Sequence, residues 1–252
     1  MRIGLIGAGN MARALGRGWG DPLLAADAGS GRASALVAEL GGEALASNLE
    51  LARRADLVVL CHKPAQLTAV AAEISGKVKA VASVLAGTTI AALQEAYPGI
   101  PVFRLIPNTA VEVRRGVTCY TPTEGVPPEL ELQVINLFER VGIVVTLSEA
   151  VVDAAAAVSS VGPAYTALLV EAQVDAAVRY GLAAPVAARL VTETMAGTAA
   201  LLAKRDYDTL TVRREVASPG GTTARGLAAL ERAGVRTAFQ DAIDAVRSWS
   251  IR

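Results

Sequence analysis

Short apolar runs and segments of helical periodicity alternate along the first half of the chain. Runs typical of β-strands occur at residues 2–6, 23–26, 57–60, 78–85, 102–106 and 142–147. Helical periodicity between successive runs predicts βαβ units and a parallel sheet. The pattern therefore indicates an α/β fold with a doubly wound sheet in the N-terminal part of the chain.

Beyond residue 148 the pattern changes to long Ala-rich stretches with few β-branched runs. This half predicts one long helix through Tyr180, a second from Pro185 to Ala203, and two more near the C-terminus. Pro185 suits the first turn of the second helix, and Gly181 suits the end of the first. The sequence thus predicts a Rossmann domain at residues 1–149 and an all-helical domain at residues 150–252.

A glycine-rich motif follows the first predicted strand. Gly7-Ala8-Gly9-Asn10-Met11-Ala12 stands between this strand and a helical pattern, the context that the G-x-G-x-x-A dinucleotide-binding motif requires. Gly7 would permit the tight turn, Gly9 would let a pyrophosphate approach the backbone, and Ala12 would let helix and strand pack closely. We predict that the chain binds NAD or NADP through Gly7, Ala8, Gly9, Asn10 and Met11. The alternative is a glycine-rich turn with no ligand.

Two signals bear on the choice of dinucleotide, and they conflict. Asp27 closes the second predicted strand, twenty residues after Gly7, where an acidic side chain would accept hydrogen bonds from the adenosine ribose of NAD. Ser30 and Arg32 follow in the next loop, where a hydroxyl and a guanidinium would suit the 2′-phosphate of NADP. The sequence leaves both cofactors open. Asp27 has the further alternative of serving as a helix cap or a solvated turn residue.

More candidates stand at the carboxyl ends of later strands, where doubly wound folds bind their ligands. Lys63 and Pro64 follow the strand at residues 57–60, and Lys63 either approaches the ribose or phosphate or is a plain surface charge. His62, the one histidine of the chain, is either a proton donor or an ordinary solvated side chain. Asn108 would place an amide near the nicotinamide, unless Pro107-Asn108 is a simple turn.

Composition narrows the class of partner. Lys and Arg number 24, as do Asp and Glu, so no net field attracts nucleic acid or an anionic membrane. Cys61 and Cys119 lack the spacing of a metal site or a disulfide framework, which predicts buried free thiols and no metal.

No apolar run reaches the roughly 18 residues of a membrane-spanning helix. We attribute the mean hydropathy of +0.41 to Ala, Val and Leu in core helices. The chain opens directly on a predicted strand, with no pattern of a secretory signal. A cytoplasmic protein with a small-molecule substrate is therefore expected.

The segment Ser218-Pro219-Gly220-Gly221-Thr222-Thr223 stands out in the helical half. Two glycines between a Ser-Pro and a Thr-Thr predict a specific turn that leads into a helix. Backbone N–H groups and two hydroxyls would then converge at a positive helix end, which suits a small carboxylate. A capped turn between helices is the alternative.

From end to end the chain resembles the pyrroline-5-carboxylate reductase family. This resemblance implies reduction of a cyclic imine with NAD(P)H to give L-proline, the last step of proline biosynthesis. It also implies an obligate dimer through the helical domain, often assembled into larger rings, with the Ser-Pro-Gly-Gly-Thr-Thr loop facing a cofactor from the neighbouring subunit. The motifs that carry the resemblance are Gly7-Ala8-Gly9-Asn10-Met11, Lys63-Pro64, Pro107-Asn108-Thr109, Gly116-Val117-Thr118, Gly162-Pro163-Ala164-Tyr165 and Ser218-Pro219-Gly220-Gly221-Thr222-Thr223.

The family pattern also implies roles within that loop. Ser218 and the backbone of Gly220, Gly221 and Thr222 would hold the substrate carboxylate, and the hydroxyl of Thr223 would meet the ring nitrogen as the catalytic contact. A protonated imine is already an electrophile, so hydride transfer to it needs no strong protein acid. The sequence shows no evident acid-base pair that would supply one.

Two positions depart from the family pattern. Val161 stands where the family usually has serine, and Ala65 follows Lys-Pro where glutamine is common. Both changes remove a polar group near the cofactor. They keep two other interpretations open. One is a reductase of the same architecture that acts on another imine or exchanges hydride between NADP and a deazaflavin, and the other is a protein that binds the dinucleotide without turnover.

Overall fold

The computed structural model describes residues 1–250, with side chains described through residue 246. The chain divides into two compact units, Met1–Pro163 and Ala164–Arg252. The sequence predicts a division at residue 149, whereas the first compact unit extends to Pro163 and includes helix α7 (Glu149–Ser159). Val152 of α7 is fully buried with Ile106 and Cys119 of the sheet, which accounts for the difference.

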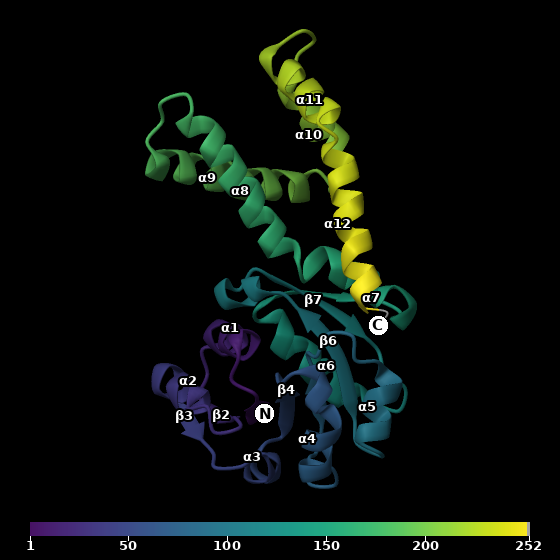
Figure 1. Cartoon of the computed structure of the whole chain (residues 1–252). Coiled ribbons are helices and arrows are strands. Elements are labelled where there is room, and N and C mark those ends of the chain that lie inside the picture. The colour runs from purple at the N-terminus through teal and green to yellow at the C-terminus, as the bar shows by residue number, and fades with distance from the viewer. Residues whose placement is uncertain (251–252) are drawn as a thin grey trace. The chain divides into compact units, whose positions relative to one another are not determined.

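An eight-stranded sheet forms the centre of the first unit, as far as the described residues show, in the order β3-β2-β1-β4-β5-β6-β7-β8 (Figure 1). Its pairs are parallel except β6 with β7, which is antiparallel. The doubly wound architecture that the sequence predicts is confirmed. The strands are β1 (Ile3–Ile6), β2 (Leu23–Ala26), β3 (Gly42–Ala44), β4 (Leu57–Leu60), β5 (Val81–Ser83), β6 (Val102–Pro107), β7 (Gly116–Thr121) and β8 (Gly142–Thr146).

Two of these strands are absent from the sequence-based prediction. Strand β3 is three residues long, partly exposed and without an apolar run, so it carries no pattern of its own. Strand β7 follows β6 after only the short 3-10 segment η2 (Thr109–Val113). A connection this short has no room for a crossover helix, and β7 therefore returns antiparallel. The predicted parallel sheet thus contains one antiparallel pair.

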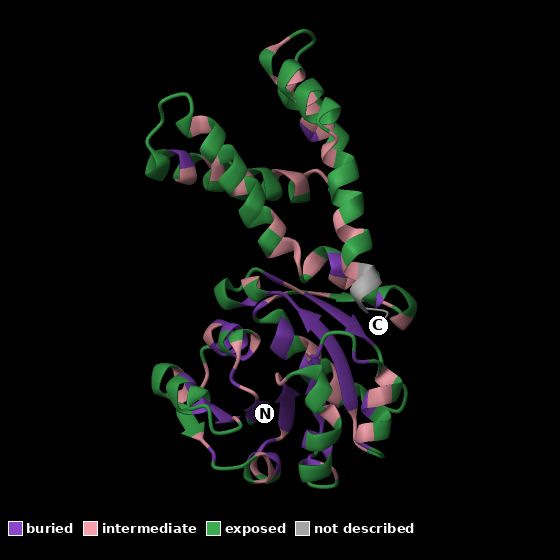
Figure 2. Ribbon diagram, in the orientation of Figure 1, coloured by how far each residue is buried: buried purple, intermediate pink, exposed green. Residues whose placement is uncertain are grey.

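Helices cover both faces of the sheet (Figure 1). One apolar cluster joins the sheet to α1 (Asn10–Trp19), α2 (Arg32–Leu40) and α6 (Pro128–Glu139), and Trp19 packs edge-on against Phe138 there, at 5.6 Å between ring centroids. A second cluster joins the sheet to the helices of the opposite face (Figure 2). These helices are α3 (Asn48–Arg54), α4 (Leu67–Ile74) and α5 (Ile90–Ala96).

A buried arginine attaches α7 to the sheet. Arg104 of β6 is 1% exposed, and its guanidinium donates to Glu149 Oε1 at 3.0 Å and to Asp153 Oδ1 at 2.5 Å. The same Glu149 oxygen accepts from the backbone N–H of Ile90 at 2.7 Å, at the first turn of α5. A buried guanidinium needs ionised partners, and Glu149 and Asp153 supply them. The Glu149 carboxylate thus connects β6, α5 and α7.

The second half is helical, as the sequence predicts, but its helices are divided differently. The long helix expected through Tyr180 is interrupted at Ser160 and Val161, and a new helix begins at Gly162-Pro163, because proline suits only a first turn. Gly181 has a φ of 92°, and Pro185 lies in the first turn of α9, as expected. Three helices rather than two follow α9 within the described residues. This half comprises α8 (Gly162–Val178), α9 (Ala184–Lys204), α10 (Thr209–Val216), α11 (Thr222–Arg232) and α12 (Val235–Ser250).

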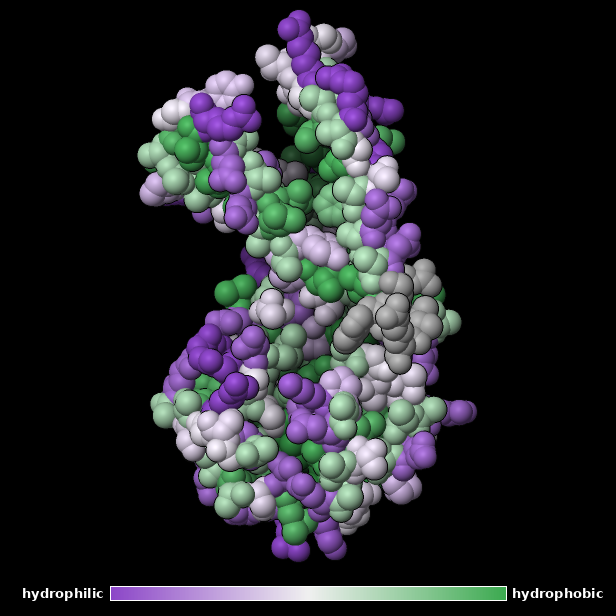
Figure 3. Space-filling view, viewed as in Figure 1, coloured by the Kyte–Doolittle hydropathy of each residue, from purple (hydrophilic) through white to green (hydrophobic). Residues whose placement is uncertain are grey.

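Much apolar surface in these helices is exposed in the single chain (Figures 2 and 3). Helix α8 has no buried residue, although it is rich in Ala, Leu and Val. By length and composition alone, Glu149–Val178 and Ala184–Lys204 are apolar enough to cross a membrane, and their most apolar windows are only 11% and 6% buried. The composition predicts that these Ala, Val and Leu residues lie in core helices, but within this chain most of them lie at the surface.

Candidate active site

Gly7 sits where the glycine-rich loop meets the loop after β4. Its φ is +93°, and a Cβ on Gly7 would lie 2.7 Å from the backbone N of His62 and 2.8 Å from the carbonyl carbon of Cys61. Its own N–H donates to the carbonyl of Ala26 at 2.9 Å. No side chain fits at this position, so glycine is required for the loops to meet.

Gly9 lies at the N-terminus of α1, and its surroundings are open. Its φ and ψ are extended, no side chain caps the helix there, and a Cβ on Gly9 would meet nothing within 4 Å. The N–H groups of the first turn lack helical partners and carry the positive end of the helix dipole. Ala12 is fully buried, which lets α1 approach the sheet. This open cradle fits the pyrophosphate of a dinucleotide.

Asp27 holds its own loop together. Its Oδ1 accepts from the backbone N–H groups of Gly29 at 2.9 Å and Ser30 at 3.1 Å, and its Oδ2 accepts from the Ser30 hydroxyl at 2.7 Å and the N–H of Ala33 at 2.9 Å. Burial raises the pKa of this carboxyl, but the hydrogen bonds from Ala33, Ser30 and Gly29 outweigh burial and lower the pKa overall. Four hydrogen bonds occupy the lone-pair directions of a carboxylate. The geometry favours the cap alternative over a ribose contact.

The loop after β4 forms a short 3-10 turn, η1 (Pro64–Gln66). Lys63 and Pro64 are exposed, and the backbone N–H of Lys63 donates to Gln66 Oε1 at 3.2 Å. Gln66 is not among the residues predicted from the sequence, although a glutamine three residues after an N-cap is the signature of a capping box. His62 is half-buried, with Nδ1 2.9 Å from the carbonyl oxygen of Lys63, so it is not an ordinary solvated side chain.

Asn108 lies after β6, at 7% exposure. Its amide Nδ2 donates to the carbonyl of Ser159 at 3.1 Å, and its Oδ1 accepts from the N–H of Val117 at 3.2 Å. The nitrogen and the oxygen of this one amide therefore join the end of β6 to α7 and β7. The side chain thus shapes the end of the strand, whereas the sequence predicts an amide placed near the nicotinamide.

The Ser218–Thr223 loop leads from α10 into α11, as predicted. Gly220 has a φ of +71°, and Gly221 precedes the helix, with its N–H donating to the carbonyl of Ser218 at 3.0 Å. A Cβ on Gly221 would lie 2.5 Å from Ser218 Oγ, so the serine hydroxyl folds over this glycine. No side chain caps α11. Its first N–H groups, beside the half-buried Thr223, suit a carboxylate.

Comparison with known proteins identifies the family to which the chain belongs. A family model for pyrroline-5-carboxylate reductase dimerisation matches residues 149–250, and a model for coenzyme F420-dependent NADP oxidoreductases matches residues 2–87. The pyrroline-5-carboxylate reductase of Mycobacterium tuberculosis is 38% identical, over 99% of this chain and 95% of that protein. The chain belongs to the pyrroline-5-carboxylate reductase family. This confirms the family that the sequence motifs indicate.

Solved structures of pyrroline-5-carboxylate reductases share the whole fold. The enzyme from Streptococcus pyogenes matches with a TM-score of 0.92 and 29% identity, over 99% of this chain and 98% of that chain. The enzyme from Plasmodium falciparum, solved with NADP bound, matches with a TM-score of 0.90 and 28% identity, over 99% and 97%. The N-terminal Rossmann unit followed by helices is therefore the architecture of this family.

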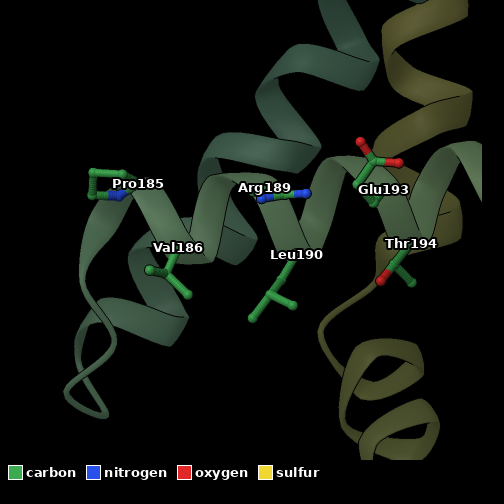
Figure 4. Close-up of a pocket in the computed structure, with 6 residues that line it drawn as sticks. All are labelled: Pro185, Val186, Arg189, Leu190, Glu193 and Thr194. Atoms are coloured by element: carbon green, nitrogen blue, oxygen red, sulfur yellow. The ribbon is translucent and has the colours of Figure 1, made fainter.

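The dimerisation model covers the helices whose apolar sides are exposed. Among the described residues, those that line an open groove of about 710 Å³ belong to α9, and Val186 and Leu190 point to the same side of this helix (Figure 4). Within the part of the chain that the structure describes, this groove has a single helix as its wall. Its lining residues are Pro185, Val186, Arg189, Leu190, Glu193 and Thr194.

The two departures from the family pattern lie at the surface. Ala65 is exposed within η1, and Val161 is half-buried in the turn between α7 and α8. Neither is buried in the core, and each replaces a side chain that would hydrogen-bond with one that does not. The fold is therefore maintained without either polar group.

Proposed function

We propose that the protein is a pyrroline-5-carboxylate reductase, which reduces the cyclic imine 1-pyrroline-5-carboxylate to L-proline with NADPH or NADH. The observation that carries this proposal is the Ser-Pro-Gly-Gly-Thr-Thr turn at the open N-terminus of α11, in a chain that matches reductases of this name over its full length. The related Plasmodium falciparum enzyme was solved with NADP bound, which supports a nicotinamide dinucleotide as the cofactor.

Residues of the first unit would hold the cofactor. Gly7, Ala8, Gly9, Asn10 and Met11 offer the pyrophosphate an open helix N-terminus. Lys63 and Pro64 would line the cofactor beside them, while Asp27 and Asn108 would act by shaping the loops in which they lie. The bound NADPH or NADH supplies the hydride for the imine carbon.

Residues of the second unit would hold the substrate. Ser218 and the backbone of Gly220, Gly221 and Thr222 would bind the carboxylate, which leaves the Thr223 hydroxyl to meet the ring nitrogen as the catalytic contact. This assignment rests on the family pattern and on the uncapped start of α11. Because the protonated imine is itself an electrophile, positioning supplies most of the catalysis, and effective-molarity data allow about 7 to 11 kcal/mol from that source.

The proposal includes a homodimer or a higher homo-oligomer built through the helical unit. An isolated helix with apolar residues on all sides is unstable in water, and α8 has no buried residue within the described chain. A second copy would cover α8 and complete the groove on α9. We place this enzyme in the cytoplasm, where soluble NADPH and NADH supply the reductant.

The test is NADPH oxidation by the purified protein in the presence of 1-pyrroline-5-carboxylate. We expect saturable loss of NADPH absorbance, and a Thr223→Ala variant of unchanged thermal stability should lose most of this activity. Full activity in Thr223→Ala would contradict the catalytic assignment. Oxidation of NADPH by a deazaflavin but not by the imine would favour the other reductase class, to which the match at residues 2–87 belongs.

A further inference from the structure

Strand β8 ends the sheet on one side, with β7 as its one neighbour among the described residues. The carbonyl of Val141 accepts from a β7 N–H at 2.9 Å, and the N–H of Leu147 donates to a β7 carbonyl at 2.8 Å. Successive residues of a strand direct their backbone groups to opposite sides, so the odd-numbered residues face β7. The N–H and C=O groups of Gly142, Val144 and Thr146 therefore point to the open edge.

The two edge strands of the sheet differ in how they are protected. Strand β3, at the opposite edge, is three residues long and has the exposed Glu43, which forms an ion pair with Arg54. A short edge strand with a charge resists pairing with another chain. Strand β8 is five residues long, and residues 142–147 include no charged residue and no proline. Its edge thus lacks these common protections.

One face of β8 is apolar and exposed. Ile143 is 57% exposed and Val145 is 37% exposed. Val145 lies beside Cys119 in the ladder, so the two side chains are on the same face of the sheet. On this face Val152 of α7 packs against Cys119 of β7 and Ile106 of β6. Helix α7 therefore covers the two neighbouring strands and leaves β8 open.

Helix α7 extends the apolar surface of β8. Glu149 and Asp153 lie on the side of α7 that faces Arg104 and α5. At about 100° per residue, Val151 and Val158 lie on the other side of the helix, toward β8, and they are 47% and 60% exposed. Both valines lie within the segment that matches the dimerisation model. We call Ile143, Val145, Val151 and Val158 the β8 surface.

We propose that the edge of β8 is an interface, at which β8 of a second copy of this chain pairs with it in the antiparallel direction about a two-fold axis. Val144 then exchanges both backbone hydrogen bonds with the partner's Val144, and Gly142 pairs with the partner's Thr146. A two-fold interface requires one surface that complements itself. This edge meets the requirement, because its outward backbone groups are centred on Val144.

The same register brings the exposed apolar side chains together. Ile143 lies opposite the partner's Val145 in a non-hydrogen-bonded pair, the closer kind of cross-strand pair. The β8 surfaces of the two copies then lie side by side on one face of a continuous sheet. This interface belongs to the first unit and adds to the one proposed through the helical unit. It does not depend on which reaction the protein catalyses.

Paired cysteines test the register directly. In the double variant Ile143→Cys/Val145→Cys, each new cysteine faces a cysteine of the partner at roughly 4.5 Å between Cα atoms, which a disulfide can span. Mild oxidation should convert most of this variant to a covalent dimer on a non-reducing gel. Ile143→Cys alone is the matched control, because its cysteines do not face each other. Failure of the double variant to cross-link, or equal cross-linking of the single variant, would overturn the register.

Particle mass from light scattering tests the interface itself. Ile143→Lys/Val145→Lys places like charges opposite each other, and Thr146→Pro removes an outward N–H while the bonds to β7 remain. Each variant should reduce the mass of the wild-type assembly to half or less. Leu132→Lys is the matched control, because Leu132 is 59% exposed on α6, which covers the opposite face, and its variant should keep the wild-type mass. Wild-type mass in both β8 variants, or a monomeric wild-type protein, would overturn the proposal, whereas the reductase assay decides the proposed function separately.

Discussion

Replacing Gly9 with alanine should weaken cofactor binding and leave the fold intact. The backbone of Gly9 is extended, with φ −78° and ψ −169°, so alanine fits without strain, and its Cβ would meet no protein atom within 4 Å. Alanine is a poorer N-cap than glycine by up to about 1 kcal/mol. It also stabilises by about 0.4 to 1 kcal/mol by restricting the unfolded chain. The two terms nearly cancel, and we expect a net change within about 0.5 kcal/mol.

The added methyl group would occupy the space through which the pyrophosphate approaches the first turn of α1. Loss of one hydrogen bond between an N–H group and a charged phosphate costs about 1.5 to 3 kcal/mol. The Kd of NADPH should therefore rise roughly 10- to 150-fold, since 1.4 kcal/mol is a factor of ten. Tm should shift by no more than about 2 °C, given 2 to 4 °C per kcal/mol for a chain of this size.

Fluorescence titration of NADPH and thermal unfolding of the free protein measure the two quantities. Gly7→Ala is the contrasting variant two residues away. Its Cβ would lie 2.7 Å from backbone at a φ of +93°, so it should destabilise the protein by about 2 to 5 kcal/mol. An unchanged Kd in Gly9→Ala would refute the assignment of this loop to the pyrophosphate, whatever the behaviour of Gly7→Ala.

Three further predictions concern the other loops. Folding lowers the pKa of Asp27 from its ordinary value of 3.8. The ionised carboxylate therefore stabilises the folded state above that pH, and this stabilisation is lost as the pH falls through the folded-state pKa. The difference in free energy of unfolding between wild type and Asp27→Asn should accordingly narrow in acid. Since the Asp27 carboxylate is occupied by its own loop, NADPH should give a higher kcat/KM than NADH, and the reverse order would show that Asp27 still binds ribose. Gly221→Ala should displace the Ser218 hydroxyl, because the new Cβ would lie 2.5 Å from Ser218 Oγ. We expect the KM for the imine to rise at least tenfold while Tm falls by less than about 4 °C. An unchanged KM would exclude Ser218 from carboxylate binding.

Periodicity and one glycine motif suffice to predict the Rossmann architecture, because buried parallel strands are apolar throughout. Strand β3 escapes this reasoning, because three residues that include an exposed glutamate are held as a strand by pairing with β2. Gly42 permits this pairing, since a Cβ there would lie 2.0 Å from the carbonyl oxygen of Leu23. Such a strand is dictated by its neighbour and not by its own residues.

The roles of the polar candidates could be predicted only in part. Position alone assigns Asp27 and Asn108 to the cofactor, because both follow strands at the ligand-binding edge. Their side chains are instead occupied by groups close in space, and the Asn108 partner Ser159 is 51 residues away in sequence. The hydrogen-bond partners of Asp27, in contrast with Ser159, all lie within six residues of it in the sequence. The cap is thus encoded locally as an Asp followed by Gly and Ser, which favours turns.

The apolar helices show why composition alone misplaces a surface. Ala, Leu and Val along α8 and α9 are the residues of a protein core, yet in the single chain they are exposed. Only the match to a dimerisation model indicates what covers them. Hydropathy reports that a surface will be buried, and it does not distinguish burial by the same chain, by another copy or by lipid.

The most direct test of the central claim measures NADPH consumed and L-proline formed in one reaction with 1-pyrroline-5-carboxylate. The account predicts that one proline appears for each NADPH oxidised, and that neither change occurs without the protein. NADPH binding without oxidation, or oxidation without proline, would contradict the assignment as a pyrroline-5-carboxylate reductase and leave only the dinucleotide-binding fold.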